Sequence, residues 1–271
     1  MKSLSNKEIL ITGTVAFDDI ETPTGSSGKI IGGAGTYIAL AASIFSKKIS
    51  LVSVIGDDFL EEDIKMLQSK NINTDMIERI AGEKSFYWKG KYHSNFKTRD
   101  TLITELNALE KFNPIVNQSS KKAEIIVLGN LHPSVQLSVL DQLESEYNFV
   151  ILDTMNFWMD TALDELNKAI NKTDLIVIND EEAEQLTGDS NLEKASNRIL
   201  KMGPKIVIIK KGDKGSEIFS EKESFHIPAY PIKSVIDPTG AGDCFAGGLA
   251  GYLSIQDQID FNSIKKSMIF G

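Results

Sequence analysis

The stretch that decides the fold is residues 236–245, which read Ile-Asp-Pro-Thr-Gly-Ala-Gly-Asp-Cys-Phe. Apolar residues follow it at helical spacing as far as Leu253, so the stretch is the turn that begins a helix. Its glycines leave backbone N–H groups free to converge on an anion, which the helix dipole also attracts. The carboxylate of Asp243 can take a proton from a hydroxyl group there, while the N–H groups stabilise the group being transferred. The pattern indicates phosphoryl transfer to an alcohol, although a capped helix after a turn explains the same residues equally well.

The composition is that of an ordinary globular protein with enough apolar residues for a large core. The chain has 271 residues, of which 41% are hydrophobic and 25% charged, and its formal net charge is -9. A charge of this sign disfavours non-specific binding to nucleic acid or to an acidic membrane surface. We therefore expect neither as a partner.

The single cysteine, Cys244, excludes an intramolecular disulfide framework. The polar residues 1–7 lack the apolar core of a signal peptide, and no apolar run is long enough to span a bilayer. We therefore expect a cytoplasmic protein. Because no histidine stands near Cys244 in the sequence, we expect it to be a small core residue rather than a nucleophile.

Short apolar runs rich in valine and isoleucine alternate with helical patterns over most of the chain. The runs are 8–15, 50–55, 124–128, 149–152, 175–178 and 205–209, and amphipathic patterns at 134–143, 161–170 and 192–202 separate the last four. Strands that are apolar throughout and lie between helices are typical of a parallel sheet covered on both faces. We predict one three-layer α/β/α domain over residues 1–271, with a mostly parallel central sheet.

The region 84–107 interrupts this series. Its aromatic residues, among them Trp88 and Tyr92, alternate with basic ones, which favours antiparallel strands with one covered face. The same alternation occurs in proteins that bind single-stranded nucleic acid, but the acidic chain makes that interpretation the weaker one. Together with a hairpin predicted at 18–31, the region is expected to form a small β-strand lid inserted in the domain.

Each predicted strand after residue 120 ends in polar groups. These groups lie at 129–130, 153–156, 179–182 and 210–212. Because open α/β sheets bind ligands outside the carboxyl ends of their strands, we expect all four segments to lie beside the helix that carries Asp243. Near the N-terminus, a glycine-rich stretch at 32–35 precedes a helix predicted at 38–45, and it lets the backbone approach either a ligand or a neighbouring strand.

With these segments in order, the chain resembles the ribokinase-like family of carbohydrate kinases, the phosphofructokinase B type. The resemblance runs from residues 13–18, Gly-Thr-Val-Ala-Phe-Asp, to residues 237–243, Asp-Pro-Thr-Gly-Ala-Gly-Asp, and so covers nearly all of the chain. It implies an ATP-dependent kinase that phosphorylates a hydroxyl of a small sugar or sugar-like alcohol, with Mg²⁺ as cofactor.

The resemblance also implies roles for residues on the acceptor side. Asp243 matches the general base, and Gly240, Ala241 and Gly242 match the anion hole. Asp18 matches an aspartate that binds sugar hydroxyls, and Gly32, Gly33 and Gly35 match a segment that lets the sugar approach.

On the nucleotide side, Asn179 and Glu182 match an Asn-x-x-Glu motif that organises Mg²⁺ and its waters around the ATP phosphates. The same residues also read as an ordinary acidic first turn of a helix. Lys210, Gly212 and Gly215 fall in the nucleotide loop, where the family has threonine in place of Lys210. Lys210 either contacts a phosphate or is a solvated charge at a strand end.

Four more positions complete the candidate site. Asp237 and Thr239 fall where many relatives bind a potassium ion, and whether this protein needs potassium stays open. Arg99 in the lid could contact an anionic group of the substrate, and Asn156 could line the sugar pocket. Ordinary solvation or packing accounts for Arg99 and Asn156 just as well.

Two departures from the family pattern limit the prediction. Tyr37 stands where ribokinase has an asparagine that contacts ribose, which puts ribose as the substrate in doubt. The sequence ends at Gly271 in a helical pattern where relatives continue, so we expect a truncated C-terminal end that weakens nucleotide binding.

Three functional hypotheses follow from these patterns. The first is the sugar kinase, and the second is a nucleoside kinase of the adenosine type, whose base would stack on the aromatic lid. The third is a ligand-binding protein without catalysis, but neither Asp243 nor the glycines beside it are lost. For the oligomeric state, we expect a homodimer formed through the exposed edge of the lid.

Overall fold

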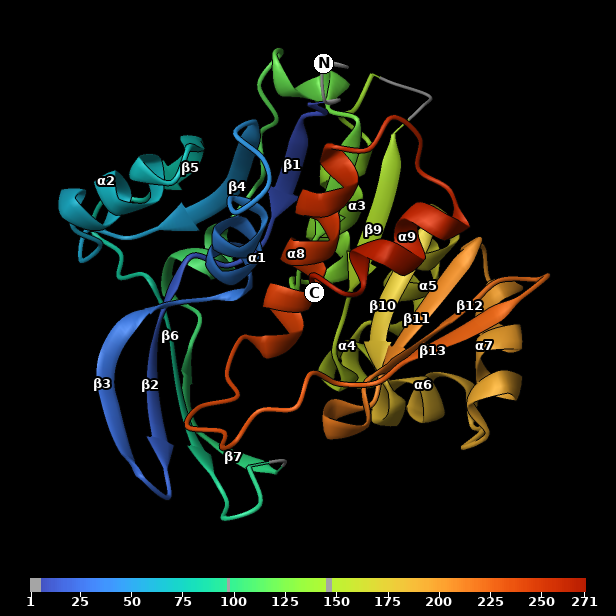
Figure 1. Ribbon diagram of the computed structural model, residues 1–271. Helices are drawn as coiled ribbons and strands as arrows, with labels where there is room; N and C mark the ends of the chain where they lie inside the picture. Colours follow the sequence, from blue (N-terminus) through green and yellow to red (C-terminus); the bar gives the residue numbers. More distant parts are fainter. Residues whose placement is uncertain (1–5, 97, 145–147) are drawn as a thin grey trace.

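The computed structural model describes residues 6–96, 98–144 and 148–271 (Figure 1). Residues 1–5 of the polar start, and residue 97 of the predicted lid range, lie outside the described residues. Within the described ranges the chain forms a nine-stranded sheet, a four-stranded sheet and the helices around them. The predicted α/β fold with a second, smaller sheet is confirmed.

The large sheet is mostly parallel. Its strand order is β13-β12-β11-β10-β9-β8-β1-β4-β5, with parallel neighbours from β11 to β5 and antiparallel pairing of β12 with β11 and β13. The strands are β1 (Ile9–Thr12), β4 (Ile49–Ile55), β5 (Ile72–Arg79), β8 (Ile125–Leu128), β9 (Phe149–Asp153), β10 (Leu175–Asn179), β11 (Ile206–Lys210), β12 (Ser216–Phe219) and β13 (Ser224–Ile227).

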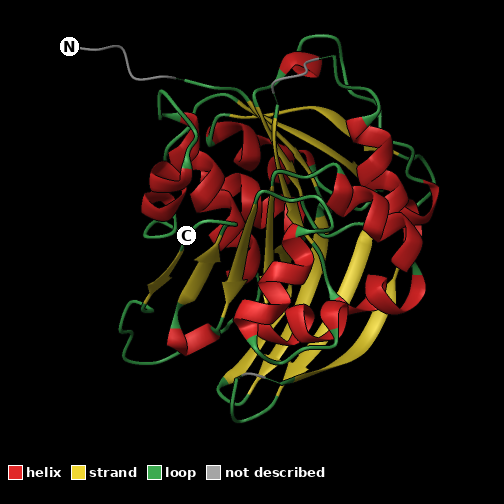
Figure 2. Ribbon diagram, turned by 90° about the vertical axis from the view of Figure 1, so that its right-hand side faces the viewer, coloured by secondary structure: helices red, strands yellow, loops and turns green. Residues whose placement is uncertain are grey.

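Helices cover both faces of the large sheet (Figure 2). One face packs on α1 (Ala34–Ala42), α2 (Glu61–Ser69), α8 (Ala241–Ser254) and α9 (Phe261–Ser267), and the other on α3 (Pro133–Leu140), α4 (Asn156–Thr161), α5 (Leu163–Asn171), α6 (Asp180–Thr187) and α7 (Leu192–Leu200). In β1, Ile9 and Ile11 join the core under α1 and α8, whereas Leu10 joins the core under α3 and α5. Because successive side chains of a strand point to opposite faces, strands that are apolar throughout build two cores. The predicted three layers are confirmed.

Short 3₁₀ helices lie at Asn107–Lys111, Ser120–Lys122 and Gly212–Lys214. The third of these turns the chain back from β11 into β12, which is why the parallel order ends there. No helix within the described ranges is long and apolar enough to cross a membrane.

The small sheet lies at the lower left of Figure 1 and has the order β3 (Gly25–Gly32), β2 (Ala16–Thr22), β6 (Phe86–Tyr92) and β7 (Arg99–Glu105). Strands β2 and β6 pair parallel, and the other two pairs are antiparallel. We predicted antiparallel strands with one covered face, and for β7 this is wrong because all of its residues are exposed. No helix layer covers this edge strand, so neither of its faces is buried.

Three strands of the large sheet were not predicted from the sequence. Strand β5 is an edge strand in which buried and exposed residues alternate over its first half, and β12 and β13 form the antiparallel hairpin at the other edge. Polar and charged residues interrupt each of them, such as Glu217 in β12, so none is a continuous apolar run. The helix predicted at 161–170 is also divided, with α4 ending and α5 beginning around Ala162.

Candidate active site

Helix α8 begins at the carboxyl edge of the large sheet, and its first turn is open. Its N-cap, Gly240, has a φ of 72° and makes no side-chain cap. A Cβ at Gly240 would lie 2.6 Å from the ring of Tyr37, so only glycine fits both this backbone conformation and this contact. The N–H of Ala241 donates to the carbonyl of Pro238 at 3.2 Å. The first-turn N–H groups of Gly242 and Asp243 therefore remain for an anion, because the first N–H groups of a helix have no intrahelical acceptor.

Asp243 lies in this first turn beside a buried ion pair. Lys210, the last residue of β11, holds its Nζ 3.4 Å from Oδ1 of Asp153, the last residue of β9. The Lys210 Nζ also lies 2.9 Å from the position that a Cβ of Gly242 would take. Burial raises the pKa of Asp243 to about 7, with a further rise from Asp153 that Lys210 opposes. Asp243 is thus a carboxylate whose protonation changes near neutral pH.

Lys210 is not the solvated charge that was one reading of the sequence. Its side chain is 19% exposed, and it faces three carboxylates, those of Asp153, Glu182 and Asp243. Burial alone would lower the pKa of its amine, but these carboxylates outweigh that effect and raise it. The neighbouring Lys211 instead points to Glu217 at 2.9 Å.

On the acceptor side, Asp18 of β2 is 5% exposed. Its Oδ2 accepts hydrogen bonds from the Gly33 N–H at 3.3 Å and from the Tyr37 hydroxyl at 3.1 Å. A Cβ at Gly32 would lie 2.0 Å from the same Oδ2, so glycine there makes room for the carboxylate. Burial raises the pKa of Asp18, and the two hydrogen bonds counteract part of that rise.

The other two glycines of this segment serve packing. Gly33 has a φ of 91°, and a Cβ on it would lie 2.5 Å from the carbonyl oxygen of Thr14. A Cβ on Gly35 would lie 2.8 Å from the backbone of Gly13, which follows β1. Of the two interpretations left open by the sequence, close approach of helix and strand therefore explains Gly33 and Gly35.

At the start of α6, Asn179 and Glu182 form a reciprocal capping box. The Asn179 Oδ1 accepts the Glu182 N–H at 2.7 Å, and the Glu182 Oε2 accepts the Asn179 N–H at 2.8 Å. Glu182 is 7% exposed, and burial raises its pKa to about 7, which Lys210 opposes and Asp153 reinforces. The carboxylate keeps its Oε1 for another partner.

A metal site built from protein groups alone does not fit the described residues, because nowhere in them do three or more His, Cys, Asp or Glu side chains surround one point. Mg²⁺ usually keeps several waters and takes few direct protein ligands. The buried Glu182 carboxylate beside Lys210 does fit a Mg²⁺ ion that ATP phosphates and waters hold.

Arg99 and Asn156 approach this region from other elements. Arg99, on exposed β7, places its guanidinium 5.7 Å from the centre of the Trp88 ring, and its charge lowers the pKa of Glu182. The small sheet thus directs a cation toward the start of α6. Asn156, the first residue of α4, donates to Gln185 of α6, so its amide is engaged with protein.

The remaining nucleotide-loop and potassium candidates shape the backbone. Gly212 and Gly215 have φ values of 58° and 87°, and a Cβ on Gly215 would lie 2.0 Å from the Ile227 carbonyl oxygen. The exposed Asp237 accepts the Thr239 N–H at 2.9 Å. The Thr239 hydroxyl lies 3.2 Å from the Tyr92 hydroxyl of β6 and so ties the α8 turn to the small sheet.

Sequence reasoning missed two residues of this arrangement and misplaced a third. Asp153 was recognised only as part of a polar strand end, and Tyr37 only as a departure from the family. Cys244 was expected in the core, but it is exposed because the first turn of α8 faces away from the sheet. The position of Asp153 at a strand end, in line with Lys210, was the signal that could have identified it.

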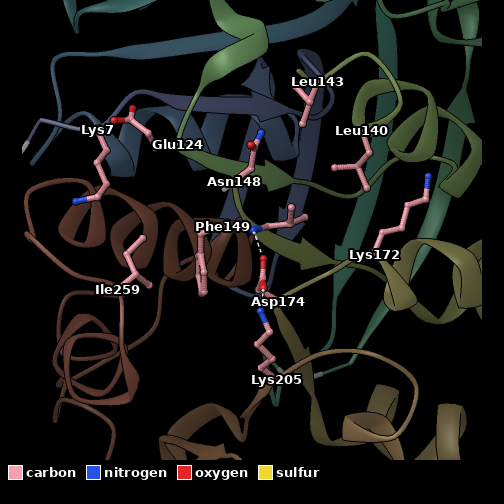
Figure 3. Close-up of a pocket in the computed structure, with 11 residues that line it drawn as sticks. Lys7, Glu124, Leu140, Leu143, Asn148, Phe149, Lys172, Asp174, Lys205 and Ile259 are labelled. Carbon is pink, nitrogen blue, oxygen red and sulfur yellow. Dashed lines mark hydrogen bonds and ion pairs between the residues drawn. The ribbon is translucent and has the colours of Figure 1, made fainter. Parts of the chain in front are cut away.

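A cavity of about 690 Å³ lies at the opposite, amino-terminal edge of the large sheet (Figure 3). It is lined by Lys7, Glu124, Leu140, Leu143, Asn148, Phe149, Val150, Lys172, Asp174, Lys205 and Ile259. Its charged groups are paired within the protein, as in the bond of 2.8 Å between Lys205 and Asp174 that Figure 3 shows. None of the candidate site residues lines this cavity.

Comparison with known proteins decides the family. Residues 10–270 match the pfkB family carbohydrate kinases. The chain belongs to this family. This PfkB-family enzyme is a kinase with an alcohol group as acceptor, which phosphorylates sugars or nucleosides, and the predicted ribokinase-like family is confirmed.

Individual relatives differ in their acceptors. The kinase is 28% identical over 253 residues to the cytidine kinase of Thermococcus kodakarensis, which covers 90% of this chain and 88% of the relative. It is 27% identical over 267 residues to the deoxyribokinase of Salmonella typhi, covering 93% and 83%. Its fold is similar to that of a protein from E. coli assigned as ribokinase II and solved in complex with ATP and Mg²⁺, with a TM-score of 0.80, 20% identity, and 96% and 90% of the two chains covered.

Proposed function

We propose that this kinase transfers the γ-phosphoryl group of ATP to a hydroxyl of a small sugar or sugar-like alcohol, with Asp243 as the general base. The observation that carries the proposal is the first turn of α8. There a carboxylate with a pKa of about 7 lies beside uncapped backbone N–H groups and the Lys210 amine. A general base works best when its pKa lies near the working pH.

The reaction balances with these groups. The acceptor oxygen bonds to the γ-phosphorus while its proton passes to Asp243, and the bond from that phosphorus to the β–γ bridging oxygen breaks. The electron pair of the broken bond leaves with ADP. The N–H groups of Gly242 and Asp243, in the turn from Gly240 through Ala241, stabilise charge on the transferred group, and Lys210 adds a cation at the same place.

The nucleotide side is assigned to the ends of β10 and β11. Glu182, positioned by its capping box with Asn179, would face a water of the Mg²⁺ ion, and that ion, when bound, neutralises phosphate charge. The turn containing Gly212 and Gly215 would follow the nucleotide, and Lys210 at its start would contact a phosphate. The relative from E. coli solved with ATP and Mg²⁺ supports this pair of ligands.

The acceptor side is assigned to Asp18, whose buried carboxylate would bind a sugar hydroxyl. Gly32 leaves space for that carboxylate, while Gly33 and Gly35 shape the turn around it. Arg99 would contact an anionic group of the substrate or a phosphate, and Asn156 would border the pocket from α4.

Nucleosides are the second candidate class. The relative named as a cytidine kinase favours them, and the relative named as a deoxyribokinase favours a free sugar. Tyr37 and Trp88 offer aromatic faces on which a base could stack. A binding protein without catalysis is the weakest candidate, because the carboxylate and the glycines of the α8 turn are all in place.

The test is ADP formation by the purified protein with ATP and Mg²⁺ over a panel of sugars, sugar phosphates and nucleosides. The Asp243→Asn variant is the matched control, since it retains the shape of the site. We expect one class of acceptor to stimulate ADP release in the wild type only. Stimulation of both proteins to the same extent would refute Asp243 as the base, and no stimulation by any acceptor would favour the binding protein.

Potassium and dimer formation are proposed together with this function. Running the panel in KCl and in NaCl tests whether Asp237 and Thr239 belong to a potassium site, with a higher rate in KCl expected. Strand β7 exposes Leu102 and Ile103 by 47% and 41%, which suits pairing of two small sheets. Light scattering should give the mass of a dimer, and the mass of a monomer would contradict the pairing.

A further inference from the structure

The inference concerns the two oxygens of the Asp18 carboxylate, and it rests on the proposed role of Asp18 in binding the acceptor. The Oδ2 accepts two hydrogen bonds from the protein, from the Gly33 N–H and the Tyr37 hydroxyl. A carboxylate oxygen has about two lone-pair positions, so Oδ2 has no position left for a substrate hydroxyl. Within the described residues no hydrogen bond reaches Oδ1, which is therefore the oxygen available to an acceptor.

Tyr37 is held in this arrangement from several sides. Its N–H donates to the Gly33 carbonyl at 3.1 Å, and its ring fills the space beside Gly240 where a Cβ would lie 2.6 Å away. Burial and the charges of Asp18, Asp237 and Asp243 raise the pKa of the phenol. The hydroxyl thus stays protonated and donates to Asp18 at any pH at which the enzyme works.

A sugar with two neighbouring hydroxyls can place one on each oxygen of a carboxylate. Here the second hydroxyl would meet an oxygen already occupied by the phenol and the backbone, and it would gain no bond there. A site that hydrogen-bonds a substrate hydroxyl rejects the analogue that lacks it, because a buried polar group is then left without a partner. At Asp18 the phenol already satisfies that group.

We propose that the Tyr37 hydroxyl takes the place of one acceptor hydroxyl at Asp18. The site then accepts sugars or nucleosides that bring a single hydroxyl to Asp18, which are 2-deoxy sugars and 2′-deoxynucleosides, as readily as their hydroxylated counterparts. Tyr37 is in this way a specificity-determining residue.

The experiment compares matched pairs that differ by one hydroxyl, ribose with 2-deoxyribose and cytidine with 2′-deoxycytidine. The kcat/KM ratio within each phosphorylated pair is measured for the wild type, for Tyr37→Phe and for Tyr252→Phe. Tyr252 lies on α8 and stacks on Phe270 at 4.6 Å, so its hydroxyl is the matched control. We expect a wild-type ratio within about threefold of one, since the second hydroxyl gains no net hydrogen bond.

In Tyr37→Phe the Oδ2 is freed, and we expect preference for the hydroxylated member to rise about tenfold, as one recovered hydrogen bond allows. Tyr252→Phe should keep the wild-type ratio. A wild type that prefers the hydroxylated member by more than tenfold overturns the inference, and so does a Tyr37→Phe ratio equal to that of the wild type.

Calorimetric binding of the same pairs to the wild type and Tyr37→Phe, with no ATP present, separates this inference from the proposed function. Loss of all phosphorylation with the expected binding ratios would refute the kinase proposal alone. Tight binding with wild-type ratios in both proteins would refute the role of Tyr37 alone. If no member of either pair binds, Asp18 does not hold such an acceptor and the inference is overturned.

Discussion

Helices α6 and α8 start with the same local pattern and end up chemically different. Each has an acid at its third residue, Glu182 in α6 and Asp243 in α8, and burial raises both pKa values to about 7. In α6 the acid bends back to the Asn179 N–H and closes a capping box, whereas α8 begins at Gly240 with no side-chain cap. A capped start uses its own N–H groups, and an uncapped start leaves them for an anion.

One lysine lies between the two starts. Lys210 lowers the pKa of both acids, and it sits there because β11 ends in register with Asn179 of β10. The comparison teaches that the N-cap residue, rather than the acid in the first turn, distinguishes a structural helix start from one that can bind a phosphoryl group.

The largest effect is expected from carboxylate-to-amide substitution at these two matched positions. Asp243→Asn removes the proton acceptor, so kcat should fall by about 10²- to 10⁴-fold while ATP binding is kept. Glu182→Gln retains an oxygen for the capping box, so kcat should fall far less and the Mg²⁺ requirement should rise. ADP formation at varied Mg²⁺ measures both, and equal losses of kcat would break the comparison.

The next effect is on the pH profile. Asp243 accepts a proton only when ionised, so with a pKa of about 7 the value of kcat/KM should fall as the pH drops below 7. Lys210→Met removes a charge that lowers this pKa, so the acid limb should move to higher pH by about one unit. Lys211→Met is the control, since Lys211 pairs with Glu217 instead. An unmoved limb in Lys210→Met would show that the lysine does not act on Asp243.

Removal of the α6 cap should have a moderate effect on stability. Asn179→Ala and Asn191→Ala each delete an N-cap side chain, the second at α7, and each should lower the free energy of unfolding by about 1 kcal/mol. Only Asn179→Ala should also raise the Mg²⁺ requirement, because Glu182 then loses its partner. Urea unfolding and Mg²⁺ titration of both variants give the two readouts. A similar Mg²⁺ response in both would separate the capping box from metal binding.

The smallest effect is expected where the α8 turn meets the small sheet. Tyr92→Phe removes the hydroxyl that lies 3.2 Å from the Thr239 hydroxyl. One partly buried hydrogen bond contributes about 1 kcal/mol, so the KM for ATP should change by about fivefold or less. Steady-state kinetics at saturating acceptor measures it. A loss of activity comparable to that of Asp243→Asn would mean that the turn depends on the small sheet.

Much of the fold could be predicted because it is written in local patterns. The apolar runs that became β8 to β11 and the turn before α8 depend on residues within a few positions of one another. Strands β5, β12 and β13 lacked such a pattern, because edge strands carry polar residues on an open side. The parallel pairing of β2 with β6 joins segments far apart in the chain, and no local signal predicts it.

The sequence by itself determined the family, the two layers of helices, and the presence of an acid in an uncapped glycine turn. The tertiary structure alone decided that Lys210 is a buried partner of Asp153 rather than a surface charge, and that Tyr37 rather than water or ligand satisfies Asp18. The physical reason is that a hydrogen bond or ion pair depends on distances of a few ångströms, which strand register and helix packing set between residues distant in the chain.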